Sequence, residues 1–146
     1  MWRFVFAFFA VIGSVSGVYA QGTLEDRVAA LRSGEITECR GCDLSGADFK
    51  KADLSGVDLT GAVLTDATFH RATLRGTILN AVTAIGTNFN LADLTRAQMA
   101  NGDFTRSMFY GAQMSGSDLS APDLTEPRRQ TTRLTSARLS AALLNR

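Results

Sequence analysis

The sequence predicts an all-β solenoid, and three features of one repeat lead to this fold class. A five-residue unit repeats without a gap over residues 42–126, which gives 17 units. The middle residue is Leu, Phe or Met in 16 of these units, and the residue two places earlier is nearly always small. A period of five fits neither a 3.6-residue helix nor the two-residue alternation of a strand. It fits a coil in which each unit turns a corner and sends these two residues inward.

The repeat resembles the motif A-(D/N)-L-x-x of the pentapeptide-repeat family. Its first four units read CDLSG, ADFKK, ADLSG and VDLTG, and the resemblance covers the whole of residues 42–126. It implies a right-handed quadrilateral β-helix in which four units, about 20 residues, make one coil and the block makes about four to five coils. The resemblance implies little chemistry. The best-understood members of the family are cytosolic dimers that mimic DNA and protect or inhibit a topoisomerase.

A 20-residue coil would stack the middle residues in columns, and the sequence supports such columns. One column is entirely phenylalanine: Phe49, Phe69, Phe89 and Phe109. The other columns are Leu54, Leu74, Leu94, Met114; Leu59, Leu79, Met99, Leu119; and Leu44, Leu64, Ala84, Phe104, Leu124. Ring stacking favours the first column. Volumes also compensate within units, because small Ala84 shares its unit with Val82, and large Phe104 shares its unit with Gly102.

Residues 1–20 predict a secretory signal peptide. Arg3 precedes an apolar run that ends at Gly17, and small residues up to Ala20 mark a cleavage point. A membrane anchor is the weaker alternative, because spanning a bilayer needs about 20 apolar residues. We therefore expect cleavage after Ala20, a periplasmic or secreted mature chain, and no stable membrane anchor. Loss of Arg3 leaves 14 basic and 14 acidic side chains, so no net field attracts nucleic acid, and we expect no nucleic-acid partner.

Residues 21–41 predict an N-terminal cap that contains a short helix and the Cys39 segment. Thr23 is the expected N-cap, acidic residues follow it in the first turn, and Gly34 is the expected end. Three apolar residues fall on one helical face: Leu24, Val28 and Leu31. A helix of this kind would cover the open end of the first coil, where bare β edges would otherwise associate.

Cys39 and Cys42 form a C-x-x-C motif that enters the first repeat. A structural disulfide is the favoured interpretation because it suits an oxidising compartment, and buried free thiols are the next. A redox site needs the motif at the start of a helix, and a zinc site needs about four ligands. The chain offers only two cysteines and the distant His70. We therefore predict no metal, no cofactor and no catalytic residue.

The outward positions contain many aspartates. The residue just before the middle one is Asp in eight units: 43, 48, 53, 58, 93, 103, 118 and 123. Short carboxylates bind nearby backbone amides, so turn formation is the simplest interpretation. None of the carboxylates has a histidine at a spacing suited to hydrolysis. The pattern thus predicts a protein that is not an enzyme.

The surface above the Phe column is the candidate interaction face. It carries cations, amides and exposed apolar residues: Lys50, Lys51, His70, Arg71, Asn90, Leu91, Met108 and Tyr110. Tyr and Met beside Arg are typical of interface centres, although scattered exposed apolar residues are also ordinary surface. We predict a non-enzymatic exported repeat scaffold or protein-interaction module with an unidentified protein partner, and a homodimer stays open. The alternative is a DNA-mimic regulator of a nucleic-acid enzyme such as a topoisomerase.

Residues 127–146 form an Arg-rich C-terminal segment. Pro127 interrupts the repeat, and five arginines follow without an acidic residue. The five-residue phase returns after the interruption, which favours a partial last coil. A capping helix is the close alternative.

Overall fold

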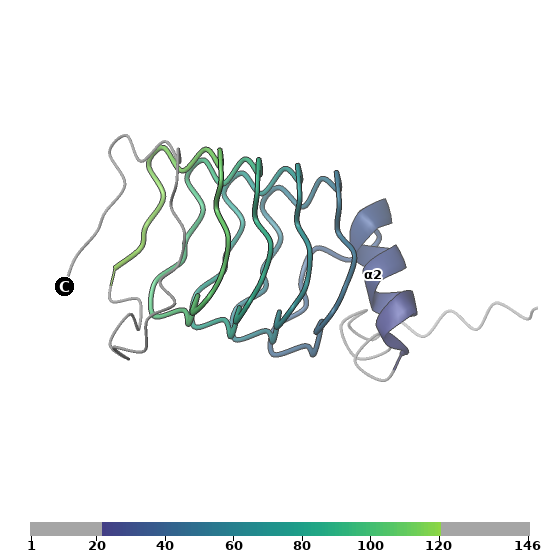
Figure 1. Ribbon diagram of the computed structural model, residues 1–146. Coiled ribbons are helices and arrows are strands. Elements are labelled where there is room, and N and C mark those ends of the chain that lie inside the picture. Colours follow the sequence, from purple (N-terminus) through teal and green to yellow (C-terminus); the bar gives the residue numbers. More distant parts are fainter. Residues whose placement is uncertain (1–21, 121–146) are drawn as a thin grey trace, which may run out of the picture.

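The computed structural model describes residues 22–120, which form one helix and a four-sided stack of β coils (Figure 1). Helix α2 spans Leu24–Ser33 and lies across one end of the stack (Figure 1). The predicted signal peptide and the Arg-rich segment 127–146 lie outside the described residues. Both therefore stay predictions.

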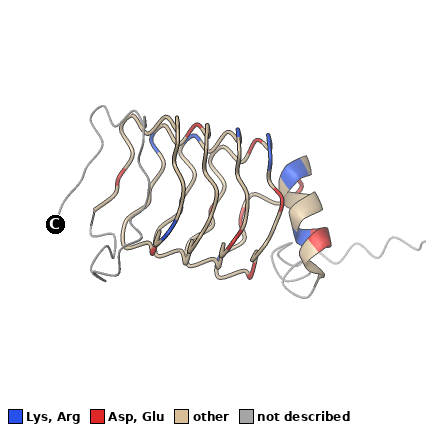
Figure 2. Cartoon of the chain, viewed as in Figure 1, with Lys and Arg blue, Asp and Glu red and all other residues tan. Residues whose placement is uncertain are grey.

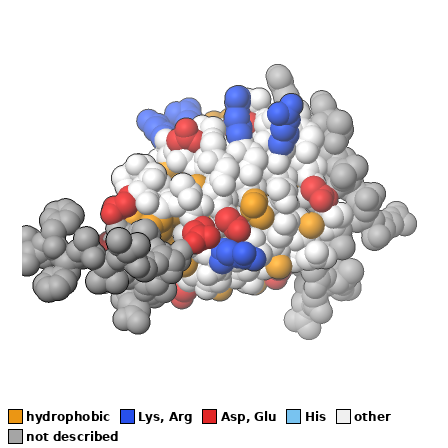
Figure 3. All heavy atoms as spheres, turned by 180° about the vertical axis from the view of Figure 1, so that it is seen from behind, with side chains coloured by type: hydrophobic (Ala, Val, Ile, Leu, Met, Phe, Trp, Pro, Cys, Tyr) orange, Lys and Arg blue, Asp and Glu red, His pale blue; other side chains and the backbone are white. Residues whose placement is uncertain are grey.

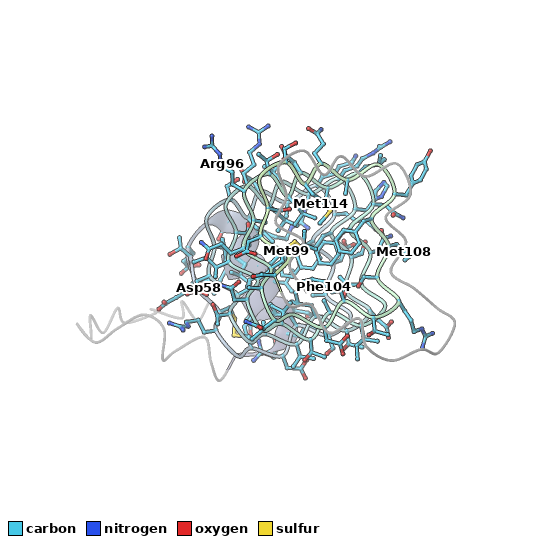
Figure 4. All side chains as sticks on the ribbon, turned by 90° about the vertical axis from the view of Figure 1, so that its left-hand side faces the viewer. Asp58, Arg96, Met99, Phe104, Met108 and Met114 are labelled. Carbon is cyan, nitrogen blue, oxygen red and sulfur yellow. A yellow bond between two sulfur atoms is a disulfide. The ribbon has the colours of Figure 1, made fainter. Side chains whose placement is uncertain are left out.

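Parallel β-bridges join residues that are 20 positions apart, which confirms the 20-residue coil. Four ladders run along the stack, and they begin at Glu38↔Asp58, Asp43↔Val63, Asp48↔Thr68 and Asp53↔Thr73. Each bridge is a single residue, because the chain turns a corner before a longer strand can form. The described residues therefore contain no strand with bounds of its own. Viewed from its C-terminal end, the chain winds counter-clockwise towards the viewer, which is the right-handed sense (Figure 4).

The β coil begins five residues before the predicted boundary at Cys42. Glu38 already bridges to Asp58, and the amide of Cys39 donates to the carbonyl of Asp58 at 2.8 Å. Residues 37–41 thus form a repeat unit, with Cys39 buried where later coils of the same column carry Leu or Met. The predicted cap of residues 21–41 therefore reduces to α2 and its connection. The sequence concealed this unit because cysteine replaces the usual leucine.

The phenylalanine column forms a continuous stack of rings at the interior. The ring centroids lie 5.1, 5.1 and 4.9 Å apart from Phe49 through Phe109, and successive planes are inclined by 14°, 8° and 9°. Every ring in the column is fully buried. Such pairs contribute about 0.5–1.5 kcal/mol each beyond the burial of their area. The predicted ring-on-ring stacking is confirmed.

Volume compensation inside the stack is also confirmed. Val82 and Ala84 are both buried. Phe104 points into the interior, as do Met99 and Met114 (Figure 4). A Cβ atom on Gly102 would lie 2.5 Å from Cε2 of Phe104, so the ring occupies the space that a side chain at position 102 would need. The Phe104 ring packs edge-on against Phe89 and Phe109, with centroids at 6.2 and 6.0 Å.

The buried hydroxyl groups in the small-residue columns donate to backbone carbonyls, three of them to the coil before and that of Ser117 to Met114. The hydroxyl of Thr77 donates to the carbonyl of Leu54 at 2.8 Å. Thr87 repeats this contact with Leu64 at 2.7 Å. Because each of these hydroxyls finds an acceptor, Thr and Ser can take the place of alanine in these columns without an unpaired group.

The aspartates before the middle residue form the predicted turns. Each of the seven that lie in residues 22–120 accepts a hydrogen bond from the amide two residues later: 43, 48, 53, 58, 93, 103 and 118. Asp43 shows the geometry, because its Oδ1 accepts from the amide of Ser45 at 3.0 Å and from its hydroxyl at 2.6 Å. These hydrogen bonds, first the one from the hydroxyl, lower the pKa of Asp43. Asp123 lies outside the described residues.

Helix α2 caps the stack as predicted. Thr23 and Asp26 form a reciprocal capping box, and Gly34 ends the helix in a left-handed conformation. Leu31 is fully buried, and Leu24 and Val28 pack against the core. The helix thus places its apolar stripe on the first coil.

Arg32 adds a polar cap that the sequence did not reveal. Its Nη1 donates to the carbonyls of Asp48 at 3.0 Å and Lys50 at 3.4 Å. In the next coil the equivalent carbonyls of Thr68 and His70 accept amides from the coil before them. The guanidinium of Arg32 therefore replaces two amides that a preceding coil would have supplied.

Candidate interaction surface

The outward side chains around the phenylalanine column form one side of the stack, which we call the Phe side. It consists of the bridging residue before each Phe and the two turn residues after it. Because each Phe points inward, these neighbours point outward. The eight predicted interaction residues all belong to this side: Lys50, Lys51, His70, Arg71, Asn90, Leu91, Met108 and Tyr110.

The exposed large apolar side chains of residues 22–120 all lie on the Phe side. They are Leu91, Met108 and Tyr110, with 41%, 37% and 57% of their surface exposed. Figure 4 shows Met108 pointing away from the stack, on the side opposite Asp58. In a solenoid whose other large apolar residues are buried or half-buried, this concentration on one side marks a candidate contact surface.

Two cations of the Phe side are unpaired. Lys51 and Arg71 occupy the same corner in successive coils, both exposed, and neither makes an ion pair within residues 22–120. Lys50 differs, because its Nζ lies 3.8 Å from Oδ2 of Asp48. Both partners of that pair are exposed, so it stabilises the fold little. The corner therefore carries positive charge that no ion pair within the described residues neutralises.

Three corner residues of the Phe side adopt a backbone conformation that favours glycine. Lys51, Arg71 and Leu91 have φ angles of 57°, 58° and 60°, whereas the next residue in the stack is Gly111. A non-glycine residue in this region costs about 1–2 kcal/mol. Leu91 also leans over its neighbour, since a Cβ on Gly111 would lie 2.7 Å from Cδ2 of Leu91. The side chains at this corner are thus present despite a backbone preference for glycine.

Asn90 has a structural role that the sequence did not reveal. Its Oδ1 accepts the amide of Tyr110, one coil further on, at 2.8 Å. In seven units of residues 22–120 that amide binds the carboxylate two residues earlier, but Met108 occupies this place and offers no oxygen. Asn80 does the same for the amide of Ala100 at 3.0 Å. Asn90 therefore holds the backbone beneath Tyr110.

The other sides of the stack contain two ion pairs. Arg75 Nε lies 2.5 Å from Oδ2 of Asp93, and Arg40 Nε lies 3.6 Å from Oδ2 of Asp58. Figure 3 views the side opposite the Phe side, where acidic, basic and apolar side chains are scattered. Over the whole stack, acidic and basic residues are interspersed (Figure 2). Arg96 and Arg106, on other sides, likewise make no ion pair within residues 22–120. The Phe side is therefore distinguished by the exposed apolar residues that lie beside its cations.

The family comparison agrees with this geometry. A model described as "Pentapeptide repeats" matches eight copies over residues 42–80 and 87–125, more than half of the chain. The protein belongs to the pentapeptide-repeat family. The interval between the matched ranges contains the unit in which valine, Val82, takes the usually small position and alanine, Ala84, takes the middle position. No curated protein sequence matches the chain.

The chain resembles several solved pentapeptide-repeat structures to different extents. Rfr23, from the cyanobacterium Cyanothece 51142, is 19% identical, with 83% of this chain and 95% of that chain covered and a TM-score of 0.65. HetL, a protein involved in heterocyst differentiation regulation from Nostoc sp. strain PCC 7120, is 25% identical over 72% of this chain and 53% of that chain, with a TM-score of 0.43. QnrB1, a plasmid-mediated fluoroquinolone resistance protein, is 20% identical over 70% and 61%, with a TM-score of 0.42. At these identities, the likeness to Rfr23 shows the right-handed β-helix and no function.

The two cysteines of this pentapeptide-repeat protein lie at bonding distance. Their sulfur atoms are 1.96 Å apart and their Cα atoms 5.4 Å apart. Cys39 occupies a middle position and Cys42 the small position of the next unit, so the bond spans the first corner of the stack. A redox site would require the C-x-x-C motif at the start of a helix. Here the motif lies in the β coil.

The described residues offer little else that could form a chemical site. Within residues 22–120, no three His, Cys, Asp or Glu side chains gather closely enough to hold a metal ion. The same residues contain no helix that is long and apolar enough to cross a membrane. Their surface chemistry therefore resides in the side chains of the four flat sides.

Proposed function

We propose that this pentapeptide-repeat protein is a non-enzymatic, exported scaffold that binds a protein partner through its Phe side. The observation that carries the proposal is the grouping of Leu91, Met108 and Tyr110 beside the unpaired Lys51 and Arg71. Tyr, Met and Arg are enriched at protein interfaces, where aromatic and Arg residues dominate the binding energy.

The rigidity of the stack suits it to binding. Amides of the Phe-side corner are paired between coils: Lys51 to His70, Arg71 to Asn90 and Leu91 to Tyr110, at 2.8–3.0 Å. The phenylalanine stack holds the same side from within. A surface fixed in this way loses little conformational entropy when a partner binds.

The carboxylates of the described coils support a non-enzymatic role. The aspartates that precede the middle residues are engaged by turn amides, and for Asp43 and Asp53 these hydrogen bonds lower the pKa. Such carboxylates stay ionised at neutral pH and are poor general acids. Their role in this part of the chain is to shape the corners.

Export is supported by the apolar run at residues 1–20 and by the cysteine pair. A disulfide at the first corner would be maintained in an oxidising compartment. We therefore place the mature protein, beginning at Gln21, in the periplasm or outside the cell. Fractionation of cells that express the full chain, with N-terminal sequencing, tests this placement. Recovery of uncleaved protein in the cytoplasm would contradict it.

The binding role is tested by cross-linking in the native host with two matched variants. The test variant is Arg71→Gly with Tyr110→Thr, and the control is Arg96→Gly with Gln113→Thr. Arg71 and Arg96 share the same place in the repeat and the same φ of 58°. Gly and Thr occur naturally at these positions in other coils, so both variants should fold. We expect specific cross-linked partners to disappear in the test variant and persist in the control. Equal retention in both variants would contradict a binding role for the Phe side.

A further inference from the structure

Resting on the proposed function, we infer that the partner of the Phe side is an acidic amphipathic helix. The Phe side is divided along the stack axis. Lys51, Arg71 and His70 lie in the coils next to α2, whereas Leu91, Met108 and Tyr110 lie in the following coils. A partner that matches this layout carries acidic residues at one end of its contact and apolar residues at the other.

Charge complementarity indicates that the partner places acidic residues opposite Lys51 and Arg71. The acidic residue of the Phe side, Asp48, is already engaged, because it binds the amide of Lys50 at 2.9 Å and lies 3.8 Å from its Nζ. Lys51 and Arg71 receive no such neutralisation within residues 22–120. Their charge is local, because the mature chain carries equal numbers of acidic and basic residues. Carboxylates on the partner would complete these pairs.

The backbone of the Phe side excludes the addition of a β-strand. Strand addition needs unpaired amides and carbonyls along a sheet edge. Here the corner amides of Lys51, Arg71 and Leu91 already donate to the next coil. The side can therefore be recognised through its side chains alone.

The spacing of the coils fits a helix. Stacked coils lie about 4.8 Å apart, so the cationic and apolar groups are separated by about 10 Å. A helix advances about 1.5 Å per residue and covers this distance in two turns, returning to the same face. Residues on one face of a strand recur at about 6.6 Å and fall out of step with the coils. We therefore expect acidic residues in one turn of the partner and Leu or Phe two turns later.

A membrane surface fits the same residues less well. The cations and the exposed apolar side chains follow one another along the same side of the stack. A lipid bilayer would need the apolar groups about 5–10 Å deeper than the charged ones. Anionic vesicles are therefore the contrasting arm of the test.

The experiment measures fluorescence anisotropy of labelled helical peptides with the mature chain, residues 21–146. One peptide carries Glu in one turn and Leu and Phe two turns later; a second replaces Glu with Lys, and a third replaces the apolar residues with Ser. We expect the first alone to bind at concentrations below about 1 mM. Arg71→Gly should weaken the affinity for this peptide about three- to fivefold, and Tyr110→Thr should weaken it about tenfold. The control Arg96→Gly should leave it within about twofold.

Several results would overturn the inference. Equal binding of the Glu and Lys peptides, or no binding of any peptide, excludes an acidic helix. Sedimentation with anionic vesicles that depends on Arg71 and Tyr110, without peptide binding, assigns the side to a membrane instead. These outcomes differ from failure of the proposed function. If cross-linking depends on the Phe side but the peptides do not bind, only the partner class is wrong.

Discussion

The packing of Gly102 against Phe104 allows a quantitative test of the interior. In Gly102→Ala, the new Cβ would lie 2.5 Å from Cε2 and 2.9 Å from Cζ of Phe104. The ring cannot withdraw freely, because it packs edge-on against Phe89 and Phe109. Overpacking of this kind costs about 1–3 kcal/mol. Gly102 has no positive φ, so alanine also gains about 0.4–1 kcal/mol by restricting the unfolded chain. We expect a net loss of about 1–2 kcal/mol, the difference between these terms.

The partner substitution turns this into a double-mutant cycle. Phe104→Leu alone should leave a void and cost about 1–2 kcal/mol. In the double variant, Ala and Leu reproduce the pairing of Ala62 with Leu64 two coils earlier, both of which are buried. We therefore expect the double variant to be at least about 1 kcal/mol more stable than the sum of the single effects. The assay is urea unfolding of the mature chain followed by circular dichroism. Additive free energies of unfolding would show that the two side chains do not share one space.

Four further predictions concern the disulfide, pH, specificity and the corner. Intact-mass measurement of unreduced mature protein should show Cys39 and Cys42 bonded, and detection of two free thiols would contradict the disulfide. Burial raises the pKa of Asp58 and of Asp93, but hydrogen bonds from neighbouring threonines and a nearby arginine outweigh it and leave both pKa values lowered. Because the folded pKa of each carboxyl lies below its unfolded value of about 3.9, ionisation of Asp58 and Asp93 stabilises the fold above pH 4, and this contribution is lost as pH falls. The urea midpoint should therefore drop between pH 7 and 3, and the drop should be smaller in Asp93→Asn. The mature chain should not inhibit gyrase at micromolar concentration, because DNA mimicry needs a continuous run of negative charge, and inhibition would favour the DNA-mimic alternative. Arg71→Gly should raise the free energy of unfolding by up to about 1 kcal/mol, because φ is 58° there, and a loss of stability would show that the arginine is held by contacts within the fold.

The sequence predicted the repeat architecture because every coil faces the same physical demand. The middle residue and the small residue must both fit inside a narrow four-sided interior. A middle residue of unusual size is therefore matched by an opposite change in size at the small position, as with Ala84 and Val82. The cap was predictable for a similar reason, since Thr23 and Gly34 satisfy local backbone needs at the two ends of α2. These features depend on position within the period, which the sequence displays directly.

Features that depend on contacts between coils were harder to predict. The first unit was missed because Cys39 takes the place of leucine, although a residue 20 positions before Leu59 could have been tested for burial. Asn90 was predicted as one of the surface amides of the interaction face, yet its oxygen accepts the Tyr110 amide. The sequence holds a signal for this contact: Met108 offers no oxygen to that amide, and an asparagine lies 20 residues before it. The cap made by Arg32 left no such signal, since it depends on the direction in which α2 crosses the coil.

The corners of the coil distinguish what the fold needs from what it tolerates. Turning the corner requires a left-handed residue, and glycine meets that need without strain. Lys51, Arg71 and Leu91 meet it at a cost, while their side chains add nothing to the buried core. Gly111, the next residue in the stack, shows that glycine suits this corner equally well. Other corners also carry non-glycine residues with positive φ, such as Asp66 and Arg96, so the fold tolerates this cost in several places. The corner at Lys51, Arg71 and Leu91 differs from them in lying beside the exposed Tyr110.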